Sequence, residues 1–161
     1  MHSVSVMSKH PVREPPEFSD RDATLPTLRA PRARILVADD DLDTLDLVSA
    51  KLRRDGYEVY EAGSGDDTLA MLDILRERED CGGGVDLLVL DVHMPRGSGV
   101  SVLRVLRSRN STIPVVLMTG DCDATLRGVA ERLHARVLAK PFSLDHLSEA
   151  AIAALLSPHA A

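Results

Sequence analysis

The sequence predicts an α/β protein with a doubly wound, five-stranded parallel sheet of the (βα)5 type. First, five short apolar runs alternate with segments whose apolar residues recur at helical spacing. Second, with two Phe, two Tyr and no Trp in 161 residues, the core must be aliphatic, which is typical of parallel strands buried on both faces. This alternation indicates right-handed crossovers, with helices on both faces of the sheet.

The expected strands are short and mostly apolar. They are Ile35–Ala38, Tyr57–Ala62, Asp86–Leu90, Ile113–Met118 and Arg136–Ala139. The third strand follows a glycine-rich loop, Gly82-Gly83-Gly84, where extra residues are tolerated because loop-closure entropy grows slowly with length.

Each strand is followed by a segment with one apolar helical face. The five faces are Leu45, Val48 and Leu52; Leu69, Leu72 and Leu75; Val102, Val105 and Leu106; Leu126, Val129 and Leu133; and Leu144, Leu147, Ala151 and Leu155. Ser64, with Asp67 three residues later, predicts a capped start for the second helix. Ser143 predicts the start of the fifth helix.

The chain divides into one folded unit with a tail at each end. Residues 1–32 contain five prolines, mixed charges and no hydrophobic period, so we expect a flexible tail. Residues 33–157 form the folded domain, and residues 158–161 form a short C-terminal tail. Because the chain stops just after the fifth helix, we expect a stand-alone domain without an attached effector domain.

Composition excludes several classes of protein. The net charge of −6 disfavours broad electrostatic attraction to nucleic acid, so we expect no direct DNA binding. Cys81 and Cys122 lack the spacing of a zinc site or a disulfide framework. With no signal peptide and no apolar run of membrane-spanning length, the sequence favours a cytoplasmic location and no membrane contact.

Polar residues follow four of the expected strands. The first strand ends in Asp39-Asp40-Asp41, the third in Asp91, the fourth in Thr119 and the fifth in Lys140. In a doubly wound sheet these ends meet at one edge. Crowded carboxylates are tolerable around a hard divalent cation such as Mg²⁺, and a lysine and a hydroxyl group can bind phosphoryl oxygens. The set therefore predicts formation of an aspartyl phosphate.

Four segments carry a family resemblance. Ile35–Asp41, Asp86–Pro95 followed by Gly99, Val115–Gly120 and Ala139–Phe142 resemble the signature blocks of response-regulator receiver domains, the CheY-like modules of two-component signalling. The resemblance spans residues 34–156. It implies a flavodoxin-like sheet with strand order 2-1-3-4-5.

The resemblance also implies a role for each site residue. Asp91 is the phosphoacceptor, Thr119 bonds the phosphoryl group, and Lys140 pairs with it through its ammonium group. Pro141 is expected to follow a cis peptide bond. The implied ligands of Mg²⁺, or of Mn²⁺ as its substitute, are Asp39, Asp40, Asp91 and the backbone carbonyl of His93.

Some positions vary or depart from the family pattern. His93 and Asp121, each two residues past a site residue, are expected to tune the lifetime of the acyl phosphate. A role for the His93 ring as a metal ligand or phosphotransfer group is disfavoured, because Mg²⁺ prefers oxygen. Val137 replaces the aromatic residue that often moves on activation, and Leu42 replaces a common proline.

The implied function is that of a phosphorelay switch, a phosphoprotein rather than an enzyme with an external substrate. A sensor histidine kinase or a histidine phosphotransfer protein phosphorylates Asp91. Phosphorylation then changes the affinity of the face formed by the fourth helix, fifth strand and fifth helix for a downstream protein. The oligomeric state stays open between a monomer and a dimer formed on phosphorylation.

Two other functions compete. One is a receiver fold that binds proteins independently of phosphorylation. The other is a phosphatase of the haloacid-dehalogenase type, because Asp41–Leu45 faintly resembles that family's nucleophile motif. The phosphatase is disfavoured, since the glycine and spacing of that motif are missing and no acidic pair follows Lys140.

Overall fold

The structure, a computed structural model, describes residues 33–77 and 84–156. Five parallel strands form one sheet in the order β2-β1-β3-β4-β5, as the resemblance implied. The strands are β1 Arg34–Ala38, β2 Glu58–Ala62, β3 Leu87–Asp91, β4 Val115–Thr119 and β5 Ala135–Ala139. Their bounds differ from the predicted runs by one or two residues, so the predicted fold class is confirmed.

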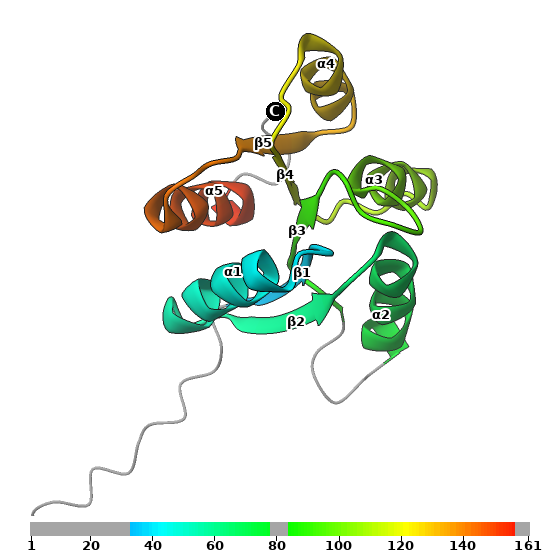
Figure 1. The fold of residues 1–161 in the computed structure, drawn as a ribbon. Coiled ribbons are helices and arrows are strands. Elements are labelled where there is room, and N and C mark those ends of the chain that lie inside the picture. The colour runs from blue at the N-terminus through cyan, green and yellow to red at the C-terminus, as the bar shows by residue number, and fades with distance from the viewer. Residues whose placement is uncertain (1–32, 78–83, 157–161) are drawn as a thin grey trace, which may run out of the picture.

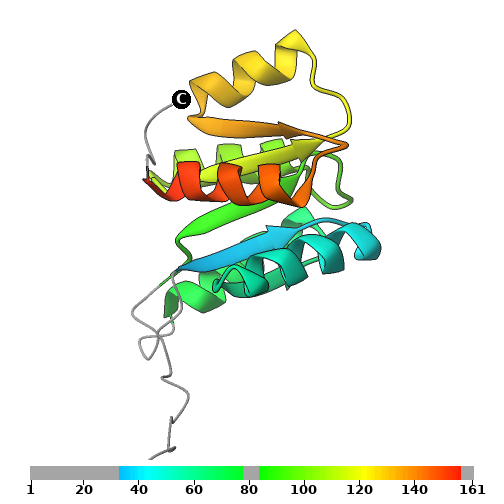
Figure 2. The same ribbon diagram turned by 90° about the vertical axis from the view of Figure 1, so that its left-hand side faces the viewer.

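The helices cover both faces of the sheet. They are α1 Leu42–Arg54, α2 Gly65–Glu77, α3 Gly99–Ser108, α4 Ala124–Arg132 and α5 Leu144–Leu156. Figures 1 and 2 show α1 and α5 on one face, with α2, α3 and α4 on the other. None of these helices is long and apolar enough to cross a bilayer. The expected tails, residues 1–32 and 158–161, and Gly82 and Gly83 of the loop lie outside the described residues.

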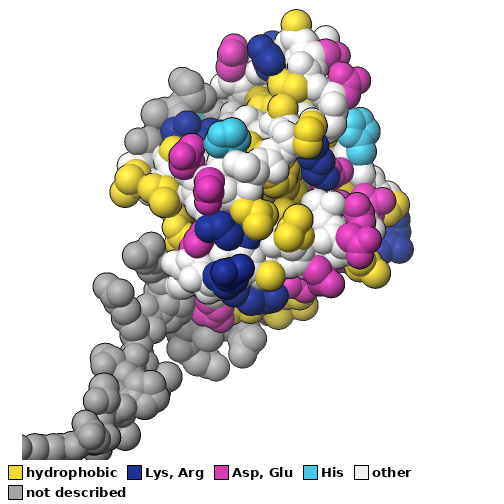
Figure 3. Space-filling view, turned by 60° about the vertical axis from the view of Figure 1, so that its left-hand side comes forward, with side chains coloured by type: hydrophobic (Ala, Val, Ile, Leu, Met, Phe, Trp, Pro, Cys, Tyr) yellow, Lys and Arg dark blue, Asp and Glu magenta, His cyan; other side chains and the backbone are white. Residues whose placement is uncertain are grey.

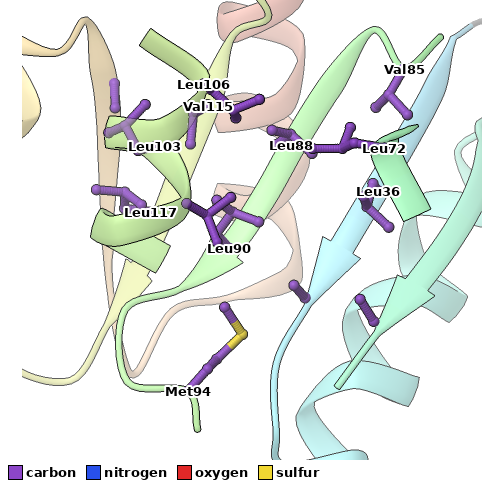
Figure 4. Packing of buried hydrophobic residues seen from close by; sticks show 14 of the residues in the cluster. Leu36, Leu72, Val85, Leu88, Leu90, Met94, Leu103, Leu106, Val115 and Leu117 are labelled. Atoms are coloured by element: carbon purple, nitrogen blue, oxygen red, sulfur yellow. The ribbon is translucent and has the colours of Figure 1, made fainter. Parts of the chain in front are cut away.

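The three central strands are buried along their whole length except at Arg34. Side chains alternate between the two faces of a strand, so Leu88 and Leu90 of β3 face α2 and α3, whereas Leu87 and Val89 face α1 and α5. Figure 4 shows Leu88 and Leu90 among the buried side chains on the α2 and α3 side of the sheet. Because both faces of β3 are packed, its carboxyl end at Asp91 has a fixed position.

Side-chain caps begin the helices, and two of them were predicted. Ser64 accepts from the amide of Asp67, and Ser143 accepts from the amide of His146. Asp41 and Asp123 cap α1 and α4, which the sequence analysis did not assign. A cap satisfies amides that have no partner within the helix, so these residues fix where the helices start after the strands.

Helix α4 is buried less deeply than the other helices and is bound at its C-terminal end by a side chain of α3. Ala130 is its only buried residue, while Leu126 and Val129 of the predicted apolar face are half-buried. Beyond its C-terminal end, Leu133 and His134 accept hydrogen bonds through their carbonyl groups from the Arg107 guanidinium, at 2.8 Å and 3.3 Å. The same guanidinium binds the carbonyls of Ser111 and Ile113. Arg107 therefore ties the end of α4 to the loop before β4.

Candidate functional site

The carboxyl ends of β1, β3 and β5 bring four predicted residues together. The ammonium group of Lys140 donates to Asp91 Oδ1 at 2.7 Å and to Asp39 Oδ2 at 2.9 Å. Asp40 lies beside them at the surface. The peptide bond between Lys140 and Pro141 is cis, as expected. Residues from distant parts of the sequence thus form one cluster at the edge where a doubly wound sheet binds its ligands.

The Asp91 carboxylate is held from two sides. Asp91 as a whole is 5% exposed to solvent. Oδ1 accepts from Lys140, and Oδ2 accepts from the amide of His93 at 2.6 Å. Helix α3 begins directly against the main chain of Asp91, since a Cβ atom on Gly99 would lie 2.4 Å from the Asp91 carbonyl oxygen. The side chain is therefore oriented by neighbours that leave it little freedom to rotate.

Burial and charge shift the pKa values of the cluster. Burial raises the pKa of the Asp39 carboxyl above its usual value, and the hydrogen bonds from Lys140 and the Asp41 amide offset part of this effect. For Lys140, burial alone lowers the pKa of the ammonium group, but the hydrogen bonds and charges of Asp91 and Asp39 together raise it. The ammonium group thus stays charged and partly neutralises the carboxylates.

Three carboxylates are close enough to share a cation. Asp39, Asp40 and Asp91 each offer an oxygen atom, and these atoms all lie within 4.8 Å of one another. Carboxylate oxygens are ligands that Mg²⁺ and Mn²⁺ prefer, and one exposed member leaves room for water in the coordination sphere. The donor set therefore fits a hard divalent cation.

The third aspartate of the acidic run does not join this cluster. Asp41 caps α1 by accepting from the amide of Asp43 at 3.1 Å, and it also accepts from the Thr44 hydroxyl at 2.9 Å. The Thr44 hydroxyl is the main reason that the pKa of the Asp41 carboxyl is lowered. The Asp41–Leu45 segment therefore forms the start of a helix, and its carboxylates are not placed as a phosphatase nucleophile at a strand end.

Thr119 lies at the end of β4 but its hydroxyl group binds elsewhere. The residue is fully buried. Its hydroxyl donates to the Asp121 carbonyl at 2.9 Å and accepts from the Asp121 amide at 3.1 Å. The main chain of Thr119 contacts the cluster, because its carbonyl accepts from the Lys140 amide at 2.6 Å. Sequence reasoning found the residue but not this pair of hydrogen bonds.

His93 and Asp121 lie on the two walls of one cleft. The cleft measures about 250 Å³ and separates the loop after β3 from the start of α4, with Val92, Leu126 and Val129 in its lining. Both His93 and Asp121 are exposed. The two predicted variable positions therefore line the same cleft, next to the loop that follows Asp91.

Val137 lies in a second groove, between α4 and β5. The groove measures about 410 Å³, and its lining includes Ala130, Ala135 and Val137 with Arg127 and Arg136. Val137 is half-buried and pairs with Leu117 of β4. The position where the family often has an aromatic residue thus lines an open groove.

The family model named response regulator receiver domain matches residues 35–152. The chain therefore belongs to the response-regulator receiver family of two-component signalling, as its signature segments indicated. Members of this family are signalling domains and not enzymes in the usual sense. Membership also removes the haloacid-dehalogenase alternative.

Individual relatives agree with this assignment. A probable transcriptional regulatory protein of Picosynechococcus is 35% identical over 127 residues, which cover 78% of this chain and 49% of the relative. The DNA-binding response regulator MtrA of Mycobacterium leprae is 35% identical over 92 residues, which cover 57% of this chain and 37% of MtrA. The crystal structure of a response regulator receiver domain protein from Clostridium thermocellum superimposes with a TM-score of 0.67 at 30% identity, covering 77% of this chain and 94% of that one.

These relatives correct one prediction. The chain matches 49% of the length of the Picosynechococcus protein and 37% of the length of MtrA. Most of the similar curated proteins are transcriptional regulators, several of them named as DNA-binding. The expectation of no direct DNA binding is therefore wrong as a statement about partners. That expectation rested on net charge alone. The charge of a receiver domain does not indicate whether a regulator also has a DNA-binding domain.

Proposed function

We propose that this domain accepts a phosphoryl group on Asp91 from a phosphohistidine of a sensor kinase or phosphotransfer protein. The supporting observation is the buried Asp91 carboxylate, held between the Lys140 ammonium group and the His93 amide beside two further carboxylates. An aspartate placed this way is oriented for nucleophilic attack, and the shared Lys140 ammonium group partly neutralises its negative charge.

The chemistry follows from these contacts. A carboxylate oxygen of Asp91 forms a bond to phosphorus as the bond from phosphorus to the donor imidazole nitrogen breaks, and the imidazole keeps the electron pair. Lys140 balances the negative charge of the phosphoryl oxygens through charge-assisted hydrogen bonds. Asp39, Asp40, Asp91 and the His93 carbonyl would hold Mg²⁺, or Mn²⁺ in its place. When bound, the cation supplies charge neutralisation at the transferring group.

Thr119 is the proposed link between phosphorylation and output. Its hydroxyl bonds the new phosphoryl group and thereby releases both hydrogen bonds to the Asp121 main chain. Since Asp121 lies just before α4, this exchange moves the start of that helix. A two-state equilibrium of the face formed by α4, β5 and α5 then shifts toward its active arrangement.

The downstream protein binds this same face in the proposal. The lining of the groove between α4 and β5 combines small apolar side chains with Arg127, Glu131 and Arg136, and α5 exposes Ile152 and Leu156. With Val137 in place of an aromatic residue, the change in the groove comes from the movement of α4. On the part of the surface that Figure 3 shows, apolar and charged side chains are interspersed.

His93 and Asp121 are proposed to set the lifetime of the acyl phosphate. Both residues line the cleft between the loop after Asp91 and the start of α4, and we propose that water approaches the phosphoryl group from this side. A carboxylate at Asp121 and an imidazole at His93 can each orient or hinder that water. Replacing them changes the rate of hydrolysis without removing the phosphoacceptor.

Intact mass after incubation with acetyl phosphate, with and without Mg²⁺, tests the function. The wild-type protein should gain the mass of one phosphoryl group only with Mg²⁺, and Asp91→Asn should gain none. Asp46→Asn, which alters an exposed aspartate on α1, is the matched control and should be labelled normally. Wild-type protein that binds neither phosphoryl nor beryllofluoride would contradict the proposal and favour binding independent of phosphorylation.

A further inference from the structure

The N-terminal end of α2 rests on the loop that follows Asp91. The amide of Gly65 donates to the Pro95 carbonyl at 3.4 Å, and the amide of Asp66 donates to the Arg96 carbonyl at 2.8 Å. The first amides of a helix have no partner within it, and here the loop supplies the acceptors. We call residues 64–67 and 95–97 together the loop–helix joint.

The side chains of Ser64, Asp67 and Arg96 form hydrogen bonds across the joint. The Ser64 hydroxyl accepts from the Asp67 amide and donates to Asp67 Oδ2. Arg96 reaches across from the loop and donates to Ser64 Oγ at 3.1 Å and to Asp67 Oδ2 at 2.9 Å. Arg96 is exposed, so its ion pair alone is weak, but Ser64 is fully buried.

Two glycines bring the backbones together inside the joint. A Cβ atom on Gly65 would lie 2.0 Å from the Gly97 carbonyl oxygen, a distance that real atoms do not reach. Gly97 has a φ of 105°, and Arg96 before it has a φ of 47°. An arginine in this left-handed region is uncommon, and it persists where surrounding contacts hold it.

The joint fixes the middle of a loop whose ends are part of the site. The loop begins with the Val92 amide bonded to the Met118 carbonyl and the His93 amide bonded to Asp91. It ends with the Gly99 amide bonded to the Val92 carbonyl. In the proposed function the His93 carbonyl would be a ligand of the cation. The path of the loop therefore sets where that oxygen lies.

We propose that the loop–helix joint is a positioning element for the phosphorylation site. It holds the His93 peptide where its carbonyl completes the cation site, and so it sets the affinity for Mg²⁺. Ser64, Asp67 and Arg96 act through the loop and touch no reacting atom. The inference rests on the proposed function, because it assigns the His93 carbonyl to the metal.

The first test is Gly65→Ala against Gly63→Ala. Both add one methyl group to the segment before or at the start of α2, but a Cβ atom on Gly63 meets nothing within 4 Å. We expect Gly65→Ala to bind Mg²⁺ about 10-fold more weakly by titration calorimetry, as changes behind a metal ligand commonly do. Labelling by acetyl phosphate should recover at saturating Mg²⁺. Gly63→Ala should behave as the wild type.

The second test removes the side-chain contacts without adding bulk. Arg96→Ala should weaken Mg²⁺ binding several-fold, and Arg96→Lys should restore part of it, because an ammonium group can still reach Asp67. Arg109→Ala removes the other ion pair to α2, with Asp73, and should leave Mg²⁺ binding unchanged. If Gly65→Ala fails to fold by circular dichroism, this series decides the question.

The outcomes separate the inference from the proposed function. Folded Gly65→Ala and Arg96→Ala proteins that bind Mg²⁺ as tightly as the wild type would overturn the positioning role and leave the phosphoacceptor intact. A wild-type protein that neither binds Mg²⁺ nor accepts a phosphoryl group would instead refute the function on which the inference depends. Weaker metal affinity with recovery at saturating Mg²⁺ supports both.

Discussion

The hydroxyl group of Thr119 is bound on both sides by the main chain of Asp121, as a donor at 2.9 Å and as an acceptor at 3.1 Å. A hydroxyl that is already satisfied leaves this position only for a stronger acceptor. A phosphoryl oxygen is such an acceptor, because hydrogen bonds to charged groups are stronger than those to neutral ones. In the proposed mechanism, phosphorylation therefore replaces the pair of hydrogen bonds that holds the Thr119 hydroxyl in this structure.

Replacing Thr119 tests this arrangement. Thr119→Val keeps the shape but removes both bonds, so the free energy of unfolding should fall by about 1 kcal/mol. Asp91 should still be labelled by acetyl phosphate. Hydrogen exchange of α4 should no longer respond to beryllofluoride, whereas Thr119→Ser should respond. A full response of α4 in Thr119→Val would show that another residue carries the signal.

Removing a buried charge should stabilise the protein without metal. Burial raises the pKa of Asp39, so its ionised form favours the unfolded state, and this cost appears as pH rises above the usual value of 3.8. Asp39→Asn should therefore increase the free energy of unfolding at pH 7 in chelator, because the amide has no charge to desolvate. It should also weaken Mg²⁺ binding. Urea titrations with chelator and with Mg²⁺ measure both effects, and a loss of stability in chelator would contradict the first.

The sequence predicted the sheet and the cluster because their signals are local. Apolar runs mark strands wherever they occur, and a strand that ends in Asp91 or Lys140 places those residues at the same edge in any parallel sheet of this order. The partner of the Thr119 hydroxyl was not predictable in this way, since it depends on the path of one turn. The contact between Gly65 and Gly97 joins the first residue of α2 to the loop after β3, and neither segment alone indicates it.

The predicted face of α4 shows a different limit. Helical spacing selected Leu126, Val129 and Leu133 for burial, yet Ala130 is the buried residue and these three are half-buried. Helix α4 lies over β5 at the edge of the sheet, where fewer neighbours cover it. Spacing identifies which side of a helix faces the sheet, but the depth of burial depends on how many elements surround that side.

Arg107 should contribute more to stability than its neighbour on the same helix. Its guanidinium donates to four main-chain carbonyl groups, and Arg107→Met leaves them without this donor. We expect the free energy of unfolding to fall by about 2 kcal/mol. Arg104→Met, at an exposed position of α3, should change it by less than about 0.5 kcal/mol. Equal effects of the two substitutions in urea unfolding would contradict this reading.

The Asp67 carboxyl should report on the loop–helix joint. Its pKa is lowered, first by the Ser64 hydroxyl and then by Arg96, so the joint is strongest above the usual value of 3.8 and weakens as pH falls through the lowered pKa. In carbon-detected titrations, Ser64→Ala should raise this pKa more than Arg96→Ala. The lowered pKa of Asp41, which depends on Thr44, is the internal control and should not change. An unchanged Asp67 pKa in both variants would contradict the hydrogen bonds described.

Helix α4 has one buried side chain along its 9 residues, and at its C-terminal end the Arg107 guanidinium donates to the Leu133 and His134 carbonyls. In the proposed switch the start of α4 moves, so we expect the helix to tilt about these Arg107 contacts. At 1.5 Å of rise per residue, the helix extends about 13 Å from these contacts toward the loop after Thr119. We therefore expect the proposed loss of the two Thr119 hydrogen bonds to displace the outer surface of α4 along its whole length, and with it a wide part of a partner's binding surface.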